Sequence, residues 1–190
     1  AWYDWPDKAL RRRDPAALEP WRTALAEDIA FHQTVQFWFF SQWRALKDHA
    51  NGLGVGIIGA LPIYVSLDSA DVWSERKAFL LDETGRPSRV AGVPPDYFSE
   101  EGQLWGNPLY DWAAMKADGF GWWIRRVEGA SRLFDAIRID HFRAFERYWS
   151  VPAGAASAKE GRWEPGPGMD LLGVLTNWFP HITYIAEDLG

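Results

Sequence analysis

The chain has 190 residues, 47% hydrophobic and 24% charged, a composition that fits a globular protein and argues against disorder. It has no cysteine, which excludes a disulfide framework and a thiolate metal site. Its net charge of −6 gives no attraction to nucleic acid or an anionic membrane, and the residues show neither a membrane-length apolar run nor a secretory signal pattern. We therefore expect no nucleic-acid or membrane partner.

The first 50 residues are predicted to be helical. Asp14 followed by Pro15 is typical of a helix start, and apolar residues then recur at helical spacing as far as Ile29. A second helix is predicted over 35–50, ended by the Gly52 region. We expect it to bury a broad apolar face made of Phe37, Trp38, Phe40, Trp43 and Leu46. The three arginines at 11–13 are predicted to be solvated.

Three apolar runs are predicted to be strands. Residues 55–61 read as a parallel strand buried on both faces, and the runs at 136–139 and 182–186 are β-rich. A helix is predicted over 120–134, and another begins at Asp170. This alternation predicts an α/β fold with a parallel sheet, resembling the central part of a (β/α)8 barrel.

The second and third strands each end at a carboxylate. Asp140 and His141 follow the run at 136–139, and Glu187 follows the last run. Because the carboxyl ends of parallel strands meet at one edge, we expect both acids to face one pocket, as glycoside chemistry requires. Plainer interpretations remain: Arg138 and Asp140 could form a structural ion pair, Glu187 a solvated turn, and His141 a core residue.

Two connections lack an obvious helix or strand pattern. Residues 74–111 form an unusually long one, marked by Gly-Pro and Gly-Asn-Pro turn signals. Between the turns lie polar and aromatic residues that suit a sugar cleft or, alternatively, an insertion packed by its own rings: Asp96, Tyr97, Phe98, Gln103 and Trp105. Residues 153–168 are predicted to be loop, after a short strand at 148–151.

The chain resembles the 4-α-glucanotransferases of the amylomaltase (disproportionating enzyme) family, in the α-amylase superfamily. The resemblance runs over nearly all 190 residues and rests on an ordered series of motifs. These are WYDWP at 2–6, LPIYV at 61–65, DSADVW at 68–73, GVPPDYFSEEGQLWGNPLYDW at 92–112, RIDHFRAF at 138–145 and IAEDLG at 185–190. It implies that residues 1–190 are one partial catalytic domain, about barrel strands 3 to 5.

The resemblance also implies roles for individual residues. Asp140 matches the catalytic nucleophile and Glu187 the general acid/base, while Arg138 keeps the nucleophile ionised. Its substrate-binding residues would be Arg138, His141 and Tyr64, with a flexible cover over the cleft at 74–111 that contributes Asp96, Tyr97, Phe98, Gln103 and Trp105. The implied enzyme is cytoplasmic, needs no metal or cofactor, and transfers segments of α-1,4-glucans such as maltooligosaccharides and amylose with retention.

The chain departs from the family pattern at three points. Ala60 stands where the family usually has Asp, so we expect weakened activity, and Ala144 replaces a common Gly, which we expect to have a minor effect. Most important, the family's third acid would fall beyond Gly190, so we expect the isolated 190 residues to be inactive and poorly folded. An α-glucan hydrolase and a non-catalytic glucan-binding fragment remain as alternatives.

Overall fold

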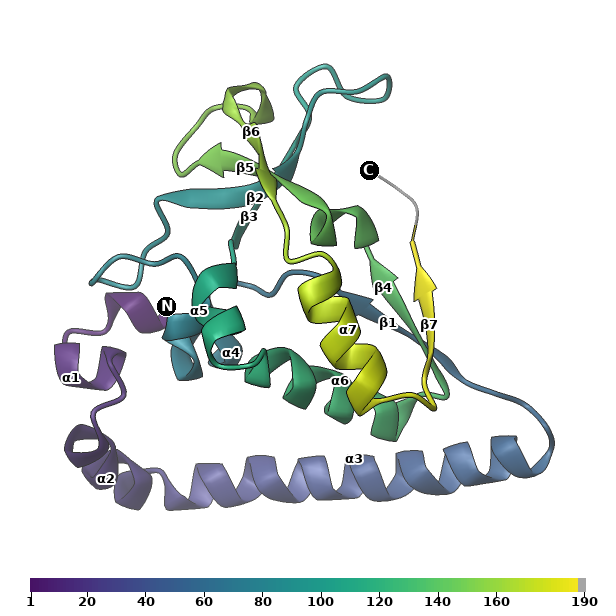
Figure 1. Ribbon diagram of the computed structural model, residues 1–190. Helices are drawn as coiled ribbons and strands as arrows, with labels where there is room; N and C mark the ends of the chain where they lie inside the picture. Colours follow the sequence, from purple (N-terminus) through teal and green to yellow (C-terminus); the bar gives the residue numbers. More distant parts are fainter. Residues whose placement is uncertain (188–190) are drawn as a thin grey trace.

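A three-stranded parallel sheet forms the centre of the computed structural model, which describes residues 1–187 (Figure 1). Its strands are β1 (Ile58–Pro62), β4 (Ala136–Asp140) and β7 (Thr183–Ala186), in the order β1-β4-β7. Ala60 pairs with Arg138, and Ile139 pairs with Ala186. The predicted parallel strands and their order along the chain are therefore confirmed.

One face of this sheet packs on the helices that follow its strands, α6 (Gly121–Leu133) and α7 (Met169–Trp178). Ile137 and Ile139 are fully buried in the same cluster as Val127 of α6 and Leu171 of α7. The helical spacing seen in the sequence from Phe120 onward thus marks the side of α6 that faces the core.

The other face of the sheet is open within residues 1–187. Burial alternates along β1, and Ile58 is 64% exposed while Leu61 is buried. Ala60 and Arg138 lie on the same exposed side. The prediction that β1 is buried on both faces is wrong here, because only one face of the sheet has helices packed on it.

A second, antiparallel sheet lies beyond the carboxyl ends of β4 and β7, above them in Figure 1. Its order is β3-β2-β5-β6. The strands are β2 (Arg89–Val93), β3 (Gln103–Pro108), β5 (Arg147–Pro152) and β6 (Arg162–Pro165). The connection after β1 supplies two strands and the connection after β4 supplies the other two, so the two connections fold together.

This sheet corrects two expectations. The segment 74–111 contains β2, β3 and a 3-10 turn, η2 (Arg76–Ala78), rather than only loop, and the segment 153–168 contains η4 (Ala158–Glu160) and β6. The strands β2, β3 and β6 do not show in the local pattern because each is short. β3 and β6 pair with their sequence neighbours β2 and β5, and only the β2–β5 pairing joins segments distant in sequence.

The N-terminal part consists of helices, the longest of which runs along the side opposite the antiparallel sheet (Figure 1). They are α1 (Lys8–Arg11), α2 (Pro15–Ala24) and α3 (Ala26–Gly52), with η1 (Trp2–Asp4) before them. Asp14 caps α2 as predicted, but the helical pattern beyond it is split at Leu25. The short elements α4 (Ala70–Ser74), α5 (Trp112–Ala117) and η3 (Phe142–Phe145) complete the fold.

The predicted buried face of α3 is exposed. Phe37 is 69% and Trp38 59% exposed, and Phe40 and Leu46 are exposed as well. The helix contacts the rest of the chain mainly through Trp43 and Lys47, which donate hydrogen bonds to the backbone at the end of α6. The expectation failed because no other described segment covers the remaining apolar surface. Within residues 1–187, no helix has the length and apolar character needed to cross a bilayer.

Candidate active site

Two acidic side chains stand at the ends of neighbouring parallel strands. Asp140 is the last residue of β4, and Glu187 directly follows β7. The backbone N–H of Glu187 donates to the carbonyl of Ile139 at 3.2 Å, which continues the strand pairing to its last residue. The backbone N–H of His141 donates to the Glu187 carboxylate at 2.8 Å. The two acids, 47 positions apart in sequence, therefore lie at one edge of the sheet.

Arg138 faces the same side of β4 as Asp140, two residues away. Its Nε donates to the Asp140 carboxylate at 2.8 Å. This hydrogen bond and the charge of Asp140 raise the pKa of Arg138, and Glu187 adds to the effect. The guanidinium is thus hydrogen-bonded to Asp140, and the negative charges of both acids stabilise its charge.

His141 turns the chain sharply at the end of β4. It is 8% exposed and adopts a left-handed backbone conformation, with φ of 53°, which is uncommon outside glycine. Its ring meets the edge of Trp105, with ring centroids 4.9 Å apart, and Trp105 in turn lies 6.2 Å from Tyr64. Side chains from β3, the end of β1 and the end of β4 therefore gather beside the acids.

The other predicted site residues lie along the hairpin between β2 and β3. Gln103 accepts a hydrogen bond from the Trp105 indole at 3.0 Å. The Asp96 carboxylate accepts from the backbone N–H groups of Phe98 and Ser99, so it closes the turn at the hairpin tip. Tyr97 and Phe98 are 96% and 92% exposed and contact each other. They are not packed against the carboxylate cluster.

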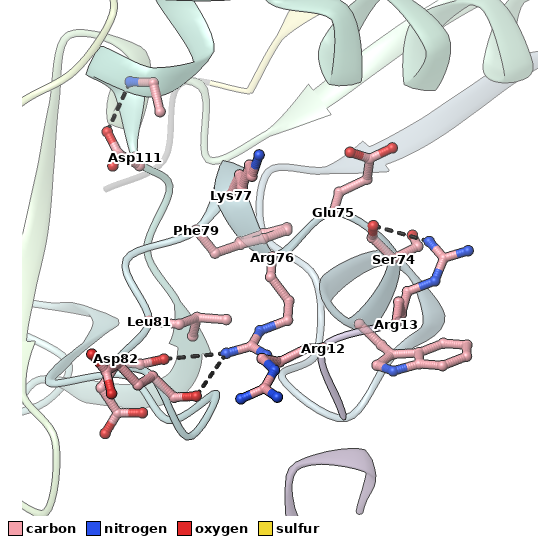
Figure 2. A pocket seen from close by; sticks show the side chains of 13 residues that line it. Arg12, Arg13, Ser74, Glu75, Arg76, Lys77, Phe79, Leu81, Asp82 and Asp111 are labelled. Carbon is pink, nitrogen blue, oxygen red and sulfur yellow. Dashed lines mark hydrogen bonds between the residues drawn. The ribbon is translucent and has the colours of Figure 1, made fainter. Parts of the chain in front are cut away.

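A surface cavity lies away from these residues. It has a volume of about 960 Å³ and is lined mainly by charged residues between α1 and η2 (Figure 2). Arg76 there donates to the carbonyls of Asp82 and Glu83, and Arg13 donates to Ser74 while stacking on Trp73. None of the predicted site residues lines this cavity. The prediction that Arg13 is simply solvated is therefore wrong, because the folded chain brings Trp73 and Ser74 into contact with it.

Sequence reasoning missed the residues that hold the end of β1. Arg126 of α6 donates to the carbonyls of Pro62 and Ile63, and the buried Tyr110 donates to Ile63 as well. The sequence offered one signal for Arg126: it stands next to the buried Val127, at the margin of the apolar face of α6. Within residues 1–187, no three His, Asp or Glu side chains come together in a way that could hold a metal ion.

The arrangement resembles the sites of one class of enzyme. Paired carboxylates at the carboxyl ends of parallel strands, with an arginine on one acid and aromatic rings alongside, are the components that enzymes acting on glycosidic bonds use. The residues after Glu187, which include Asp188 and the end of the IAEDLG motif, lie outside the described part of the chain.

Comparison with known proteins identifies the family. A family profile described as 4-alpha-glucanotransferase matches residues 1–190, and the chain belongs to this family. It is 53% identical over 189 residues to the 4-alpha-glucanotransferase of Thermus thermophilus and 50% identical over 190 residues to the chloroplastic/amyloplastic 4-alpha-glucanotransferase of Solanum tuberosum. Each match covers all of this chain but only 38% and 33% of the relative, respectively.

Solved structures agree with this assignment. The amylomaltase from Streptococcus agalactiae in complex with acarbose matches with a TM-score of 0.95 and 43% identity, over 100% of this chain and 38% of that one. The amylomaltase from Corynebacterium glutamicum matches 79% of this chain and 21% of that one at a TM-score of 0.69; at 23% identity it supports the fold alone. The mixed α/β fold is therefore that of part of an amylomaltase.

Proposed function

We propose that the complete protein is a retaining 4-α-glucanotransferase, which moves segments of α-1,4-glucans between maltooligosaccharides or starch-type glucans. The observation that carries this proposal is the pairing of Asp140 and Glu187 at adjacent strand ends, within a chain of the 4-alpha-glucanotransferase family. Residues 1–190 would contribute about strands 3 to 5 of a (β/α)8 barrel, with segment 74–111 as part of the cover over its cleft.

The first half of the reaction cleaves the donor. The ionised carboxylate of Asp140, held by Arg138, attacks the anomeric carbon and forms a glycosyl ester, while the glycosidic bond breaks. Glu187 gives its proton to the departing glycosidic oxygen and becomes a carboxylate. The product of this half is a covalent glycosyl-enzyme and a shortened glucan with a free hydroxyl.

The second half delivers the glycosyl group to an acceptor. Glu187 removes the proton of an incoming sugar hydroxyl, whose oxygen attacks the anomeric carbon and displaces Asp140. Two inversions restore the original configuration. Transfer prevails over hydrolysis if an acceptor sugar occupies the site and excludes water, and the partly exposed ring of Trp105 beside His141 is suited to hold it. Tyr64 is buried and packs against Trp105.

Product analysis with maltotriose tests this function in the complete protein. Transfer releases glucose and forms glucans longer than maltotriose, whereas a hydrolase of the same superfamily forms only shorter sugars. A third outcome, binding of maltooligosaccharides without any product, would identify a glucan-binding protein. Trapping a covalent intermediate with a fluoroglucosyl donor, and losing it in Asp140→Asn, would establish double displacement; a product of inverted configuration would overturn it.

A further inference from the structure

Arg126 is a half-buried cation in α6 that reaches the carboxyl end of β1. Its guanidinium donates to the carbonyl of Pro62 at 2.5 Å, to the carbonyl of Ile63 at 3.0 Å and to the hydroxyl of Tyr110 at 3.2 Å. It also lies 5.0 Å from the ring centroids of two tryptophans of α6, Trp122 and Trp123. Arg126 forms no salt bridge with any residue in 1–187, so its charge serves backbone carbonyls and aromatic rings.

Tyr110 doubles this attachment. Its hydroxyl donates to the same Ile63 carbonyl at 2.5 Å, and its ring stacks on Tyr64 with centroids 5.8 Å apart and planes 21° apart. Burial raises the pKa of Tyr110, although the charge of Arg126 acts in the opposite sense. A neutral, buried hydroxyl is thus available as a donor. Arg126 and Tyr110 therefore both donate to the carbonyl of Ile63, the residue immediately before Tyr64.

From Tyr64 a line of contacts leads to the acids. Tyr64 is buried and touches Trp105, whose ring meets His141. The backbone N–H of His141 donates to Glu187 at 2.8 Å. A shift of the backbone at Ile63 would therefore move the ring wall beside the two acids, because each member of the line is packed against the next.

We propose that Arg126 is a positioning residue of the active site, which fixes the aromatic wall of Tyr64, Trp105 and His141 by clamping the backbone at the end of β1. The inference rests on the proposed function of this site. Arginine suits the task because its rigid fork donates in several fixed directions and stacks on rings, whereas lysine offers a flexible point charge. The clamp acts through Tyr110 and Tyr64 and does not touch the substrate.

The test compares Arg126→Lys with Arg125→Lys in the complete protein. Arg125 is the adjacent residue of the same helix, is exposed, and pairs with Glu75 instead. We expect Arg126→Lys to lower kcat for maltotriose disproportionation between about tenfold and hundredfold, the range in which misplacement by about 1 Å acts. It should also change KM and lower the transfer-to-hydrolysis ratio. Arg125→Lys should leave all three unchanged.

These readouts separate positioning from stability. KM and the transfer-to-hydrolysis ratio do not depend on how much protein is folded, so a lower Tm alone cannot change them. If Arg126→Lys lowers Tm while KM and the ratio stay at wild-type values, Arg126 is merely structural and the inference is overturned. If the wild-type protein makes no transfer products, the proposed function fails instead, which is a distinct result.

A rescue experiment keeps the test decisive if Arg126→Lys folds poorly. A surface pocket of about 200 Å³ is lined by Arg126 itself together with Glu75 and Trp122, so a small cation can reach this position. Added ethylguanidinium should restore the transfer-to-hydrolysis ratio of Arg126→Ala and should not affect the wild type. Tyr110→Phe keeps the ring stack and loses one donor, so it should shift the ratio in the same direction by less. Failure of both would contradict the clamp.

Discussion

The predicted site residues fall into two regions that are held in different ways. Arg138, Asp140 and Glu187 stand at the ends of paired parallel strands, where ladder hydrogen bonds fix the backbone. Tyr97 and Phe98 stand at a hairpin tip held by turn hydrogen bonds and are almost fully exposed. The difference teaches that the groups proposed for bond chemistry sit on rigid elements, whereas Tyr97 and Phe98, two of those proposed for holding glucan, sit on an exposed turn.

Between these regions lies Trp105, which belongs to the hairpin but contacts the strand ends through His141. Its exposed fraction of 38% is far below those of Tyr97 and Phe98. The comparison therefore predicts a gradient of effects. Substitutions at the strand ends should abolish chemistry, Trp105 should alter the fate of the intermediate, and the hairpin tip should alter only binding.

The largest effect is expected for Glu187→Gln in the complete protein. Loss of the general acid/base should reduce kcat for disproportionation by roughly 10²–10⁴-fold, and Asp140→Asn should reduce it at least as much. Folding should be retained, because both changes are nearly isosteric. Asp170→Asn, an exposed acid paired with Lys116, is the matched control and should retain wild-type activity. Substantial transfer activity in either active-site variant would break the comparison.

Trp105→Ala should have the next largest effect. Removing the ring that meets His141 admits water to the covalent intermediate, so the hydrolysis-to-transfer ratio should rise. The expected rise is roughly twofold to tenfold, because an aromatic pair contributes about 0.5–1.5 kcal/mol. Quantifying glucose and longer glucans from maltotriose measures it. Trp178→Ala, at an exposed tryptophan of α7, is the control. An unchanged product ratio would count against the role of this ring.

Changes at the hairpin tip should be milder still. Tyr97→Ala and Phe98→Ala remove almost fully exposed rings, so the free energy of unfolding should change by no more than about 0.5 kcal/mol. If the tip holds glucan, KM for long maltooligosaccharides should rise while kcat stays close to wild type. Steady-state kinetics against maltotriose and a longer glucan separate the two. A large fall in kcat would show that the tip belongs to the rigid region.

Ala60→Asp tests the departure from the family pattern at the strand ends. Ala60 pairs with Arg138 on the exposed face of the sheet, so an aspartate there could give the guanidinium a second carboxylate beside Asp140. We expect kcat/KM to rise by no more than about fivefold, because an exposed ion pair contributes about 1 kcal/mol or less. Ala60→Asn, which adds the shape without the charge, is the control. Lower activity in Ala60→Asp alone would contradict the expected benefit.

The smallest effect concerns the opposite ends of the strands, where Asp135 precedes β4. Its carboxylate accepts from the N–H of Ile57 and from Asn51, and these hydrogen bonds, together with Lys47, lower the pKa of Asp135. A depressed pKa contributes stability above the unfolded value of about 3.9, and this stability is lost as the pH falls through the folded value.

Asp135→Asn should therefore lower the free energy of unfolding at neutral pH by about 1 kcal/mol or less after solvent screening, and Tm should fall with it. The difference from wild type should vanish as the pH falls below the usual range of an aspartate. Thermal unfolding between neutral and acidic pH measures it, with Asp48→Asn on exposed α3 as control. A difference that persists at acidic pH would show that the charge of Asp135 is not its cause. Asp135→Asn should leave the transfer-to-hydrolysis ratio unchanged, in contrast to the substitutions at the carboxyl ends of the strands.

Much of the central sheet could be predicted from the sequence. The strands ending at Asp140 and Glu187, and the buried side of α6, follow from local apolar patterns because one helix face or one strand carries the whole signal. Of the antiparallel sheet, the sequence predicted only β5, as the short strand at 148–151. The strands β2, β3 and β6 are short, and the sheet is completed only where β2 and β5, from different connections, pair, so this pairing is a property of the folded chain.

Helix α3 shows the opposite kind of failure. Its apolar residues predicted burial, yet Phe37 and Trp38 are mostly exposed within the described chain. An apolar pattern indicates which face of a helix favours burial, but it does not indicate which segment packs on that face. Arg126 was missed for a related reason. It donates to the carbonyls of Pro62 and Ile63, which lie more than 60 positions earlier in the chain.

By itself, the sequence determined the family, the alternation of strands and helices, and the identity of the acids that end two of the strands. Only the tertiary structure decided that Glu187 meets the backbone of His141, that Trp105 faces that histidine's ring, and that Arg126 clamps the end of β1. The physical reason is range. Apolar periodicity acts between near neighbours in the chain, whereas strand register and side-chain contacts across the fold depend on how distant segments pack together.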